Sequence, residues 1–200
     1  MNTQQIAAAL LEKDLIVCDT ETTGLDEHAE IVELGAVDKR GRILINDLVR
    51  PTRPSPQVAV DINRLDNDFL QDMGMPWGHV VEHLVKYQDA TFVFFNAVFD
   101  VAMIEQTHKF HNFKHGRGLG VDLSFIAFNS FDLMELANRH FHRHLEWNKE
   151  KSCFKRLSLE KCCELAGIDY TKDAHRAIPD CLVTLELLKF IANDVVEQKK

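Results

Sequence analysis

The sequence predicts a three-layer α/β/α fold built around a mixed five-stranded sheet. Two observations indicate it: the first strand-like runs are joined by a hairpin turn, and the later ones alternate with helical patterns. A chain of 200 residues, 46% of them hydrophobic, is long enough to form one compact domain. We therefore expect a single domain over residues 1–200, with its core at about 13–195.

The first elements are strands. Residues 15–18 are four consecutive apolar side chains, as in a strand buried on both faces. Residues 30–37 are rich in aliphatic and β-branched side chains, and 38–41 are typical of a hairpin turn. The turn would return the chain into a third strand over 43–49. Three prolines then break regular structure, which predicts a loop over 51–57.

The rest of the chain is predicted to alternate helices with strands. Apolar residues at a spacing of 3.6 predict helices, whereas short bounded apolar runs predict strands. Residues 108–121 carry no such periodicity and indicate a surface loop. The expected elements are helices at 67–73, 78–88, 99–107, 130–142, 157–166 and 176–194, and strands at 91–95 and near 123–128.

The first strand-like run ends at Asp19 and Glu21, two carboxylates separated by one residue. Side chains at i and i+2 of a strand share a face, so these two point the same way, about 6.5 Å apart along the backbone. Two such carboxylates at the end of a buried strand need a positive partner. Because hard cations such as Mg²⁺ prefer carboxylate oxygen, a divalent-metal site is the hypothesis. The alternative, for each acid taken alone, is a solvated surface charge.

Three segments, in this order along the chain, resemble the motifs of the DEDD 3'-to-5' exonucleases. This family includes the epsilon subunit of DNA polymerase III, exonuclease X and ribonuclease T. The resemblance implies the ribonuclease-H-like fold, with three leading antiparallel strands and two parallel ones. The His-x4-Asp form of the third motif marks the DEDDh branch. The three segments are Asp19-Thr-Glu-Thr-Thr-Gly-Leu25, Asn96-Ala-Val-Phe-Asp100 and His175-Arg-Ala-Ile-Pro-Asp180.

The resemblance implies that four carboxylates hold two Mg²⁺ or Mn²⁺ ions. Asp19 would bridge the two ions. Glu21 and Asp180 would bind the first ion, and Asp100 would support the second. Two ions about 3.5–4 Å apart would activate the attacking water and stabilise the leaving oxygen.

By the same resemblance, His175 is the general base. An imidazole with a pKa of about 6.5 can remove a proton at neutral pH. Pro179 suits the first turn of a helix, which places His175 at or before the start of the last helix. For a lone histidine in a chain with ten, the alternative is a surface or capping role.

The resemblance also implies a pocket for the end of the substrate. The backbone near Thr22 would contact the terminal 3' hydroxyl, Leu25 would wedge against the last base, and Gly24 would allow close approach. Asn96, in the second motif, is a further candidate substrate contact, and Phe99 would either stack on a base or pack in the core. Candidate phosphate contacts, with ordinary solvated charge as the alternative, are Lys155, Arg156 and Arg176.

Two positions depart from the family pattern. Phe95 stands where the second motif usually opens with His, and residues 61–65 replace a common His-Gly-Ile stretch. Neither position is a metal ligand, so we expect substrate handling to differ and the chemistry to remain.

The predicted activity is therefore a metal-dependent 3'-to-5' exonuclease that releases nucleoside 5'-monophosphates from single-stranded DNA or RNA ends. The alternative is a catalytically silent nucleic-acid-binding or polymerase-associated module of the same fold. A structural interaction protein is a third interpretation. The net charge of −8 argues against a protein that coats nucleic acid, but an enzyme that grips one strand end needs acidic metal ligands.

The remaining features concern the cellular location of the protein and its partners. No run reaches the roughly 20 apolar residues that span a bilayer, and the N-terminal residues lack a basic signal region, so we expect a cytoplasmic protein. Five cysteines without a Cys-x-x-Cys pair indicate reduced, mostly buried thiols. Homodimer formation, association with a polymerase and the preference for DNA or RNA stay open.

Overall fold

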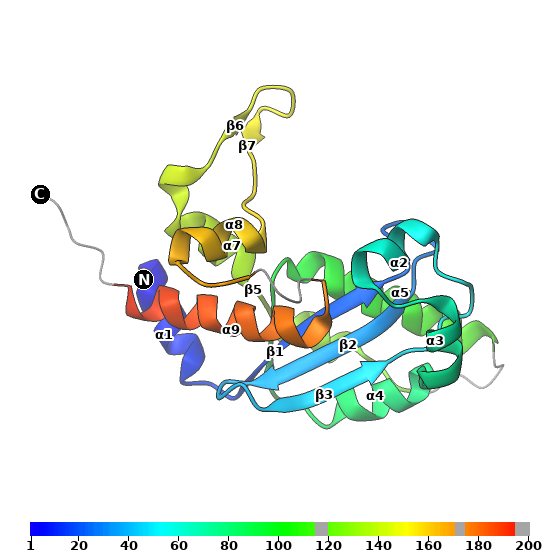
Figure 1. Ribbon diagram of the computed structural model, residues 1–200. Helices are drawn as coiled ribbons and strands as arrows, with labels where there is room; N and C mark the ends of the chain where they lie inside the picture. The colour runs from blue at the N-terminus through cyan, green and yellow to red at the C-terminus, as the bar shows by residue number, and fades with distance from the viewer. Residues whose placement is uncertain (115–119, 171–174, 195–200) are drawn as a thin grey trace, which may run out of the picture.

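A five-stranded mixed sheet forms the centre of the molecule in a computed structural model, which describes residues 1–114, 120–170 and 175–194, the side chains of 112–114 excepted (Figure 1). The strand order is β3-β2-β1-β4-β5. The first three strands pair antiparallel, and β4 and β5 run parallel to β1, as predicted. The strands are β1 (Leu15–Thr22), β2 (Ile31–Asp38), β3 (Ile43–Leu48), β4 (Thr91–Phe94) and β5 (Ser130–Asp132).

Helices cover both faces of this sheet, which confirms the three-layer prediction. Along β1, Leu15 and Val17 point into one core, while Ile16 and Cys18 point into the other. The Leu15 face packs against α1 (Thr3–Leu11), α7 (Leu133–His140), α8 (Leu159–Ala166) and α9 (Ala177–Asn193). The Ile16 face packs against α4 (Trp77–Val85), α5 (Ala97–Lys114) and α6 (Ser124–Phe128). None of the helices in the described part of the chain is long and apolar enough to cross a bilayer.

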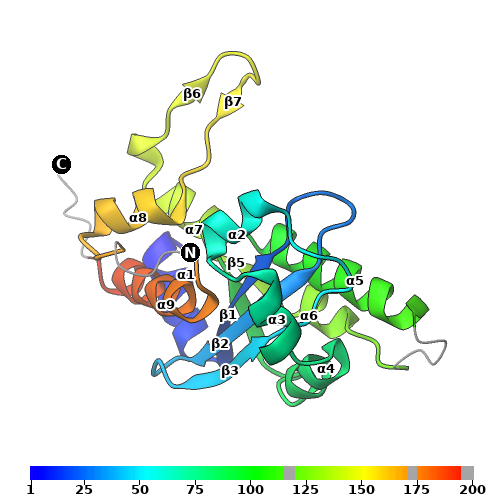
Figure 2. The ribbon, with the colours of Figure 1, turned by 45° about the vertical axis from the view of Figure 1, so that its right-hand side comes forward.

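Two further parts extend beyond the layers. Helices α2 (Gln57–Asn63) and α3 (Asn67–Met73) follow β3, and Leu65 and Leu70 pack on Val32 of β2. Between α7 and α8 the chain forms a 3₁₀ turn (His142–His144) and a short hairpin of β6 (Trp147–Asn148) and β7 (Cys153–Phe154). Figures 1 and 2 show this hairpin projecting well away from the body of the protein.

The strand predicted near 123–128 is wrong, because these residues form helix α6. The side chain of Asp122 accepts hydrogen bonds from both the backbone N–H and the hydroxyl of Ser124, a turn that starts the helix. The fifth strand is the three-residue β5 that follows, and helix α7 therefore begins at Leu133 rather than at residue 130.

Other boundaries also differ from the prediction. Strand β1 includes Asp19 and Glu21, as the strand geometry assumed for them requires, and ends one residue later at Thr22, paired with β2. Helix α5 continues to Lys114, where a loop over 108–121 was expected; residues 115–119 of that loop lie outside the described residues. Helices α1 and α2 and the β6–β7 hairpin were not predicted. Of the five cysteines, all free, Cys153 is exposed and the other four are buried.

Candidate active site

Three carboxylates meet where β1 ends. Asp19 and Glu21 lie on the face of β1 that packs against α9, and Asp180 lies in the first turn of α9. One oxygen of each lies within 4.8 Å of the others. Two oxygens bound to one Mg²⁺ are at most about 4.2 Å apart, twice a metal–oxygen distance of about 2.1 Å. Small side-chain movements would therefore bring all three onto one ion.

Helix α9 reaches this point because its first turn lies directly on β2. Gly35 is opposite Asp19 in the strand pair, and a Cβ added at Gly35 would lie 2.9 Å from Ala177. Any larger residue would push the helix away from the sheet. Pro179 lies in the first turn of the helix, as the sequence predicted, and carries no N–H that would need a partner.

Glu33 holds the start of this helix in place. It is opposite Glu21 in the strand pair and only 2% exposed. Its carboxylate accepts two forked hydrogen bonds from Arg176, with the shortest at 2.7 Å, and one from the backbone N–H of Ala177 at 3.0 Å. Arg176, expected among the phosphate contacts, is thus engaged with Glu33.

Asp100 approaches from the other face of the sheet. Helix α5 starts just after β4, which is parallel to β1, so both strands deliver their carboxylates to the same edge. The hydroxyl of Thr20, between the two β1 acids, donates a 2.7 Å hydrogen bond to Asp100. Asp100 is 3% exposed and close enough to Asp19 for its charge to raise the pKa of Asp19.

Burial and mutual repulsion make this group difficult to ionise fully. Burial raises the pKa of Glu21 to about 8, and the charges of nearby carboxylates, Asp180 first, add to the rise. Burial likewise raises the pKa of Asp100 to about 7 and that of Asp180 to about 6. For Asp19, burial and then the charge of Asp100 raise the pKa well above its ordinary value. A divalent cation among them would relieve both effects.

The hydrogen bonding of Asp180 fits such a cation. Its Oδ2 accepts a 3.1 Å hydrogen bond from the hydroxyl of Tyr170. Its Oδ1 is buried and, within the described part of the chain, accepts no hydrogen bond. A buried carboxylate oxygen without a donor costs free energy, and a metal ion would satisfy it. The residues present therefore fit a hard divalent cation.

His175 lies beside this group, two residues before the start of α9. It is exposed, its φ is +66°, and it lies close enough to Asp180 to oppose the rise in the pKa of that carboxyl. Its position before the helix start is the predicted one. The turn thus places an exposed imidazole next to a metal-binding candidate.

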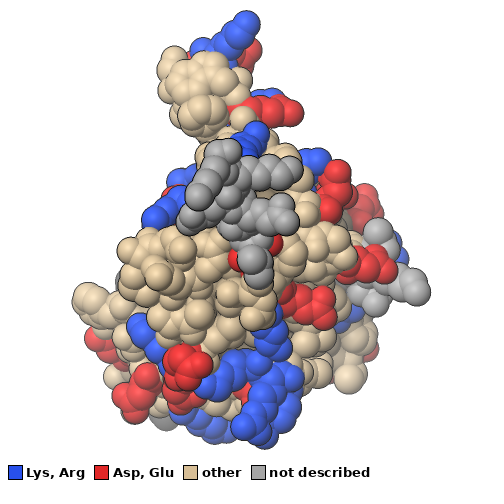
Figure 3. Space-filling view, turned by 90° about the vertical axis from the view of Figure 1, so that its left-hand side faces the viewer, with Lys and Arg blue, Asp and Glu red and all other residues tan. Residues whose placement is uncertain are grey.

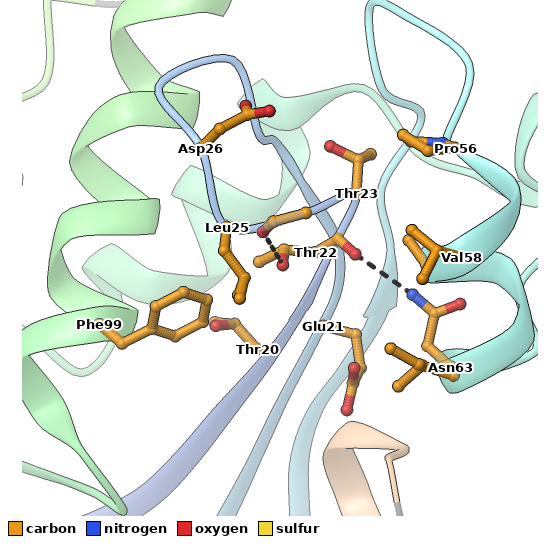
Figure 4. A pocket seen from close by; sticks show the side chains of 13 residues that line it. Thr20, Glu21, Thr22, Thr23, Leu25, Asp26, Pro56, Val58, Asn63 and Phe99 are labelled. Atoms are coloured by element: carbon orange, nitrogen blue, oxygen red, sulfur yellow. Dashed lines mark hydrogen bonds between the residues drawn. The ribbon is translucent and has the colours of Figure 1, made fainter.

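An apolar pocket of about 600 Å³ opens beside Glu21. Of the predicted substrate contacts, Thr22, Gly24, Leu25 and Phe99 line it. Figure 4 shows Leu25 and Phe99 on one side of this pocket and Val58 and Asn63 on the other. Leu25 is 84% exposed, and Phe99 both lines the pocket and packs on the core.

Asn96 is the predicted substrate contact that the pocket does not include. It lies in the turn between β4 and α5 with a φ of +76°, and its backbone N–H donates to Asp132. Phe95, in the place of the usual histidine, packs against the core on the α9 side of the sheet.

Sequence reasoning missed several residues that shape the site. Asn63 is buried, donates to the carbonyl of Thr22 at 3.3 Å and accepts from the N–H of Leu65. The only feature of the sequence that could have indicated Asn63 is the departure from the family pattern at residues 61–65. Glu33 and Gly35 give no signal until the pairing of β2 with β1 is known. Thr20 stands inside the first motif, but its role becomes clear only when the face of the sheet on which Asp100 lies is known.

A second group of possible ligands, Asp47, His79 and His83, lies on β3 and α4. There the carboxylate is already paired, because Asp47 Oδ2 lies 2.7 Å from His83 Nδ1. In the cluster of Asp19, Glu21 and Asp180, by contrast, Asp180 Oδ1 has no hydrogen-bond partner among the described residues. This cluster is therefore the stronger candidate for a metal site.

Comparison with known proteins places this chain in a family. The family model described as exonuclease (RNase T) matches residues 16–188. An uncharacterized exonuclease, CP81, of Escherichia phage 186 is 34% identical over 94% of this chain and 93% of its own length. The DNA polymerase III epsilon subunit of Pasteurella multocida is 28% identical over 86% of this chain, which spans 64% of that subunit.

The fold is shared with solved nucleases. Exonuclease X, solved in complex with 5' overhanging duplex DNA, superposes with a TM-score of 0.59 at 24% identity, covering 90% of this chain and 91% of that one. Together with the strand order, this similarity confirms the ribonuclease-H-like three-layer fold predicted from the motifs.

Proposed function

The chain belongs to the RNase T family of exonucleases, and we propose that it removes nucleotides one at a time from the 3' end of single-stranded DNA or RNA. The products would be nucleoside 5'-monophosphates. The observation that carries the proposal is the group of Asp19, Glu21 and Asp180 oxygens within 4.8 Å, one of them buried without a donor among the described residues. A phosphodiester carries negative charge, so four carboxylates alone would repel it.

We propose that two divalent cations, Mg²⁺ or Mn²⁺, overcome this repulsion. Asp19, Glu21 and Asp180 would hold one, and Asp19 with Asp100 the other. Bound there, the ions would supply stabilisation of the charge that develops on the phosphate oxygens. Thr20 would keep Asp100 oriented through its 2.7 Å hydrogen bond.

In this proposal His175 is the general base that accepts a proton from the attacking water. Its exposure gives it access to substrate and solvent, and its position two residues before the helix that carries Asp180 would keep it beside the reacting phosphate. The protonated imidazole would then lie next to the carboxylate of Asp180, which would stabilise it.

The pocket beside Glu21 would hold the terminal nucleoside. Its volume of about 600 Å³ is within the usual range of small-ligand sites. Leu25 and Phe99 would cover one face of the base, and the backbone at Thr22 and Gly24 would meet the sugar. Apolar contacts to a base face do not depend on its identity, which suits an enzyme that removes every nucleotide in turn.

The test is the shortening of a 5'-labelled oligonucleotide in Mg²⁺, with DNA and RNA strands of the same sequence digested side by side. We expect a ladder of products that EDTA abolishes. Because the exonuclease X complex contains 5' overhanging duplex DNA, a recessed 3' end is the third substrate. Glu21→Gln should abolish the ladder, and Glu27→Gln, a solvent-exposed neighbour, should leave it unchanged. A wild-type protein that binds the strand without shortening it would be the silent module instead.

The role of His175 has its own test. His175→Ala should lower turnover about 10²–10⁴-fold, the usual loss for a general base, with Mn²⁺ affinity retained. His28→Ala, a change of an exposed histidine away from the carboxylates, is the matched control. An unchanged rate in His175→Ala would remove this residue from the proposal.

A further inference from the structure

The β6–β7 hairpin projects from the body as an arm, defined here as residues 142–156 (Figures 1 and 2). Two residue pairs, Trp147 with Phe154 and Asn148 with Cys153, form its ladder. The side chain of Asn148 accepts hydrogen bonds from the N–H groups of Glu150 and Lys151, which closes the turn at the tip. The arm thus has a defined backbone, and its strands β6 and β7 project from the body.

An aromatic pair stands on this arm. The rings of Trp147 and Phe154 meet edge to face across the two strands, with centroids 5.1 Å apart. That contact helps to hold an otherwise marginal hairpin together. It nevertheless leaves the residues 53% and 56% exposed. Exposed ring faces of this kind are the surfaces on which successive bases of a single strand stack.

The charge of the arm is opposite to that of the whole chain. It carries five Lys or Arg and two Glu, a net charge of +3 with His neutral, in a chain of net charge −8. Figure 3 shows Lys and Arg side chains at the tip of the protrusion, with acidic ones beside them. Lys149 and Lys151 are both exposed there. Cations interleaved with aromatic rings are typical of single-strand binding surfaces.

The base of the arm is fixed to helix α7, which shares a core with the helix that carries Asp180. Arg156 pairs with Glu135 of α7 at 3.2 Å, and the N–H of Leu157 donates to Asn138 of the same helix at 2.9 Å. Helices α7 and α8 share one hydrophobic core with α9, whose first turn presents Asp180. In both views the arm and helix α2, which lines the pocket, rise from the same side of the body.

We propose that this arm binds the single strand on the 5' side of the end being hydrolysed, with bases stacked on Trp147 and Phe154 and phosphates paired with Lys149 and Lys151. The inference rests on the proposed function for the identity of the strand. The carboxylate site would act on the terminal nucleotide, and the arm would hold the nucleotides upstream. Short substrates would therefore bind without the help of the arm.

Tryptophan fluorescence tests the interaction directly, because the chain has two tryptophans and the other, Trp77, is 1% exposed. In a Glu21→Gln background, titration with a single-stranded decanucleotide should quench the emission of Trp147, and a dinucleotide should not. Trp147→Phe should abolish the quenching while fluorescence anisotropy of a labelled decanucleotide still reports binding. Absence of quenching in the presence of measured binding would overturn the proposal.

Affinity gives the second readout. The double change Trp147→Ser and Phe154→Ser should weaken decanucleotide binding about 10-fold or more. Lys149→Gln with Lys151→Gln should reduce the salt slope of binding by about 0.7 for each phosphate that no longer pairs with a lysine. Phe128→Ser, at an 84% exposed phenylalanine on α6, is the matched control and should change neither value. Equal affinities in the arm variant and this control would overturn the proposal.

A small ester substrate distinguishes a failure of this inference from a failure of the proposed function. The p-nitrophenyl ester of thymidine 5'-monophosphate reaches the carboxylate site but not the arm. In the serine double variant, kcat/KM for the oligonucleotide should fall about 10-fold relative to that for the ester. Hydrolysis of neither substrate by the wild type would contradict the proposed function, while the binding titrations would still decide the arm. If the serine double variant binds the oligonucleotide as tightly as the wild type does but self-associates less in sedimentation experiments, the arm would instead be an interface between copies of the chain.

Discussion

Two pairs of acidic residues lie on or next to the neighbouring strands β1 and β2, and their surroundings differ. Asp19 and Glu21 on β1 face other carboxylates, and burial raises the pKa of each. Glu33 on β2 accepts hydrogen bonds from a guanidinium and a backbone N–H. Glu30, just before β2, accepts from the N–H and hydroxyl of Thr52. Although burial alone would raise its pKa, His111, whose Nε2 lies 3.3 Å from the carboxylate, and these hydrogen bonds lower it.

We propose that this difference separates acids that stabilise the fold from acids that bind metal. A buried carboxylate with its own donors stabilises the fold, because the donors replace the water that burial removed. A buried carboxylate that faces others of the same charge destabilises the fold unless an ion binds. The protein itself supplies donors to Glu33 and Glu30, whereas for Asp19 and Glu21 we propose that a cation takes that place.

The largest expected effect comes from Asp19→Asn. Turnover should fall on the order of 10³-fold or more, because cations at such sites supply several kcal/mol of transition-state stabilisation. Mn²⁺ affinity should fall with it. At the same time the Tm of the metal-free protein should rise, since one of the repelling charges is gone. Calorimetry in EDTA measures the Tm, and Mn²⁺ titration measures the affinity. Retained Mn²⁺ affinity would contradict the bridging role of Asp19.

Glu33→Gln should give the opposite result. The free energy of unfolding should fall by about 1–3 kcal/mol, because the guanidinium of Arg176 and the N–H of Ala177 lose a charged acceptor. Metal-free protein should be destabilised less than the loaded protein, because loss of the Glu33 charge also removes its repulsion of Asp19 and Glu21. Urea unfolding with Glu27→Gln as control measures this change. A Glu33→Gln protein as stable as the control would mean that the two acid pairs do not differ as described.

Whether the sequence could predict the role of each acid depends on how far along the chain its interaction partners lie. Asp19 and Glu21 share a face through local strand geometry, and Pro179 marks the start of its helix locally, so both were predictable. The role of Glu33 depends on the register between β1 and β2 and on a helix about 140 residues away, which no local pattern encodes. Helix α6 was mistaken for a strand because five apolar residues fit either element. The strands of the arm are too short to show a period of two.

The smallest expected effect is on the pH dependence of the metal-free protein. Folding raises the pKa of Glu21 to about 8, of Asp100 to about 7 and of Asp180 to about 6, above the unfolded values of about 4. The folded state then binds more protons than the unfolded state, so the stability these groups contribute is complete below about pH 4 and is lost as the pH rises to 8.

In EDTA the Tm of the wild type should therefore fall between pH 6 and pH 8, and Mn²⁺ should raise it more at pH 8 than at pH 6. Glu30, whose pKa is lowered, stays ionised throughout this window and adds no slope. His140, whose pKa burial lowers, adds a slope of the opposite sign. It does so equally in Glu21→Gln, so the difference between wild type and this variant isolates the carboxylates. Equal pH slopes in both proteins would mean that the β1 acids are as well compensated as those of β2, and the contrast between the two pairs would disappear.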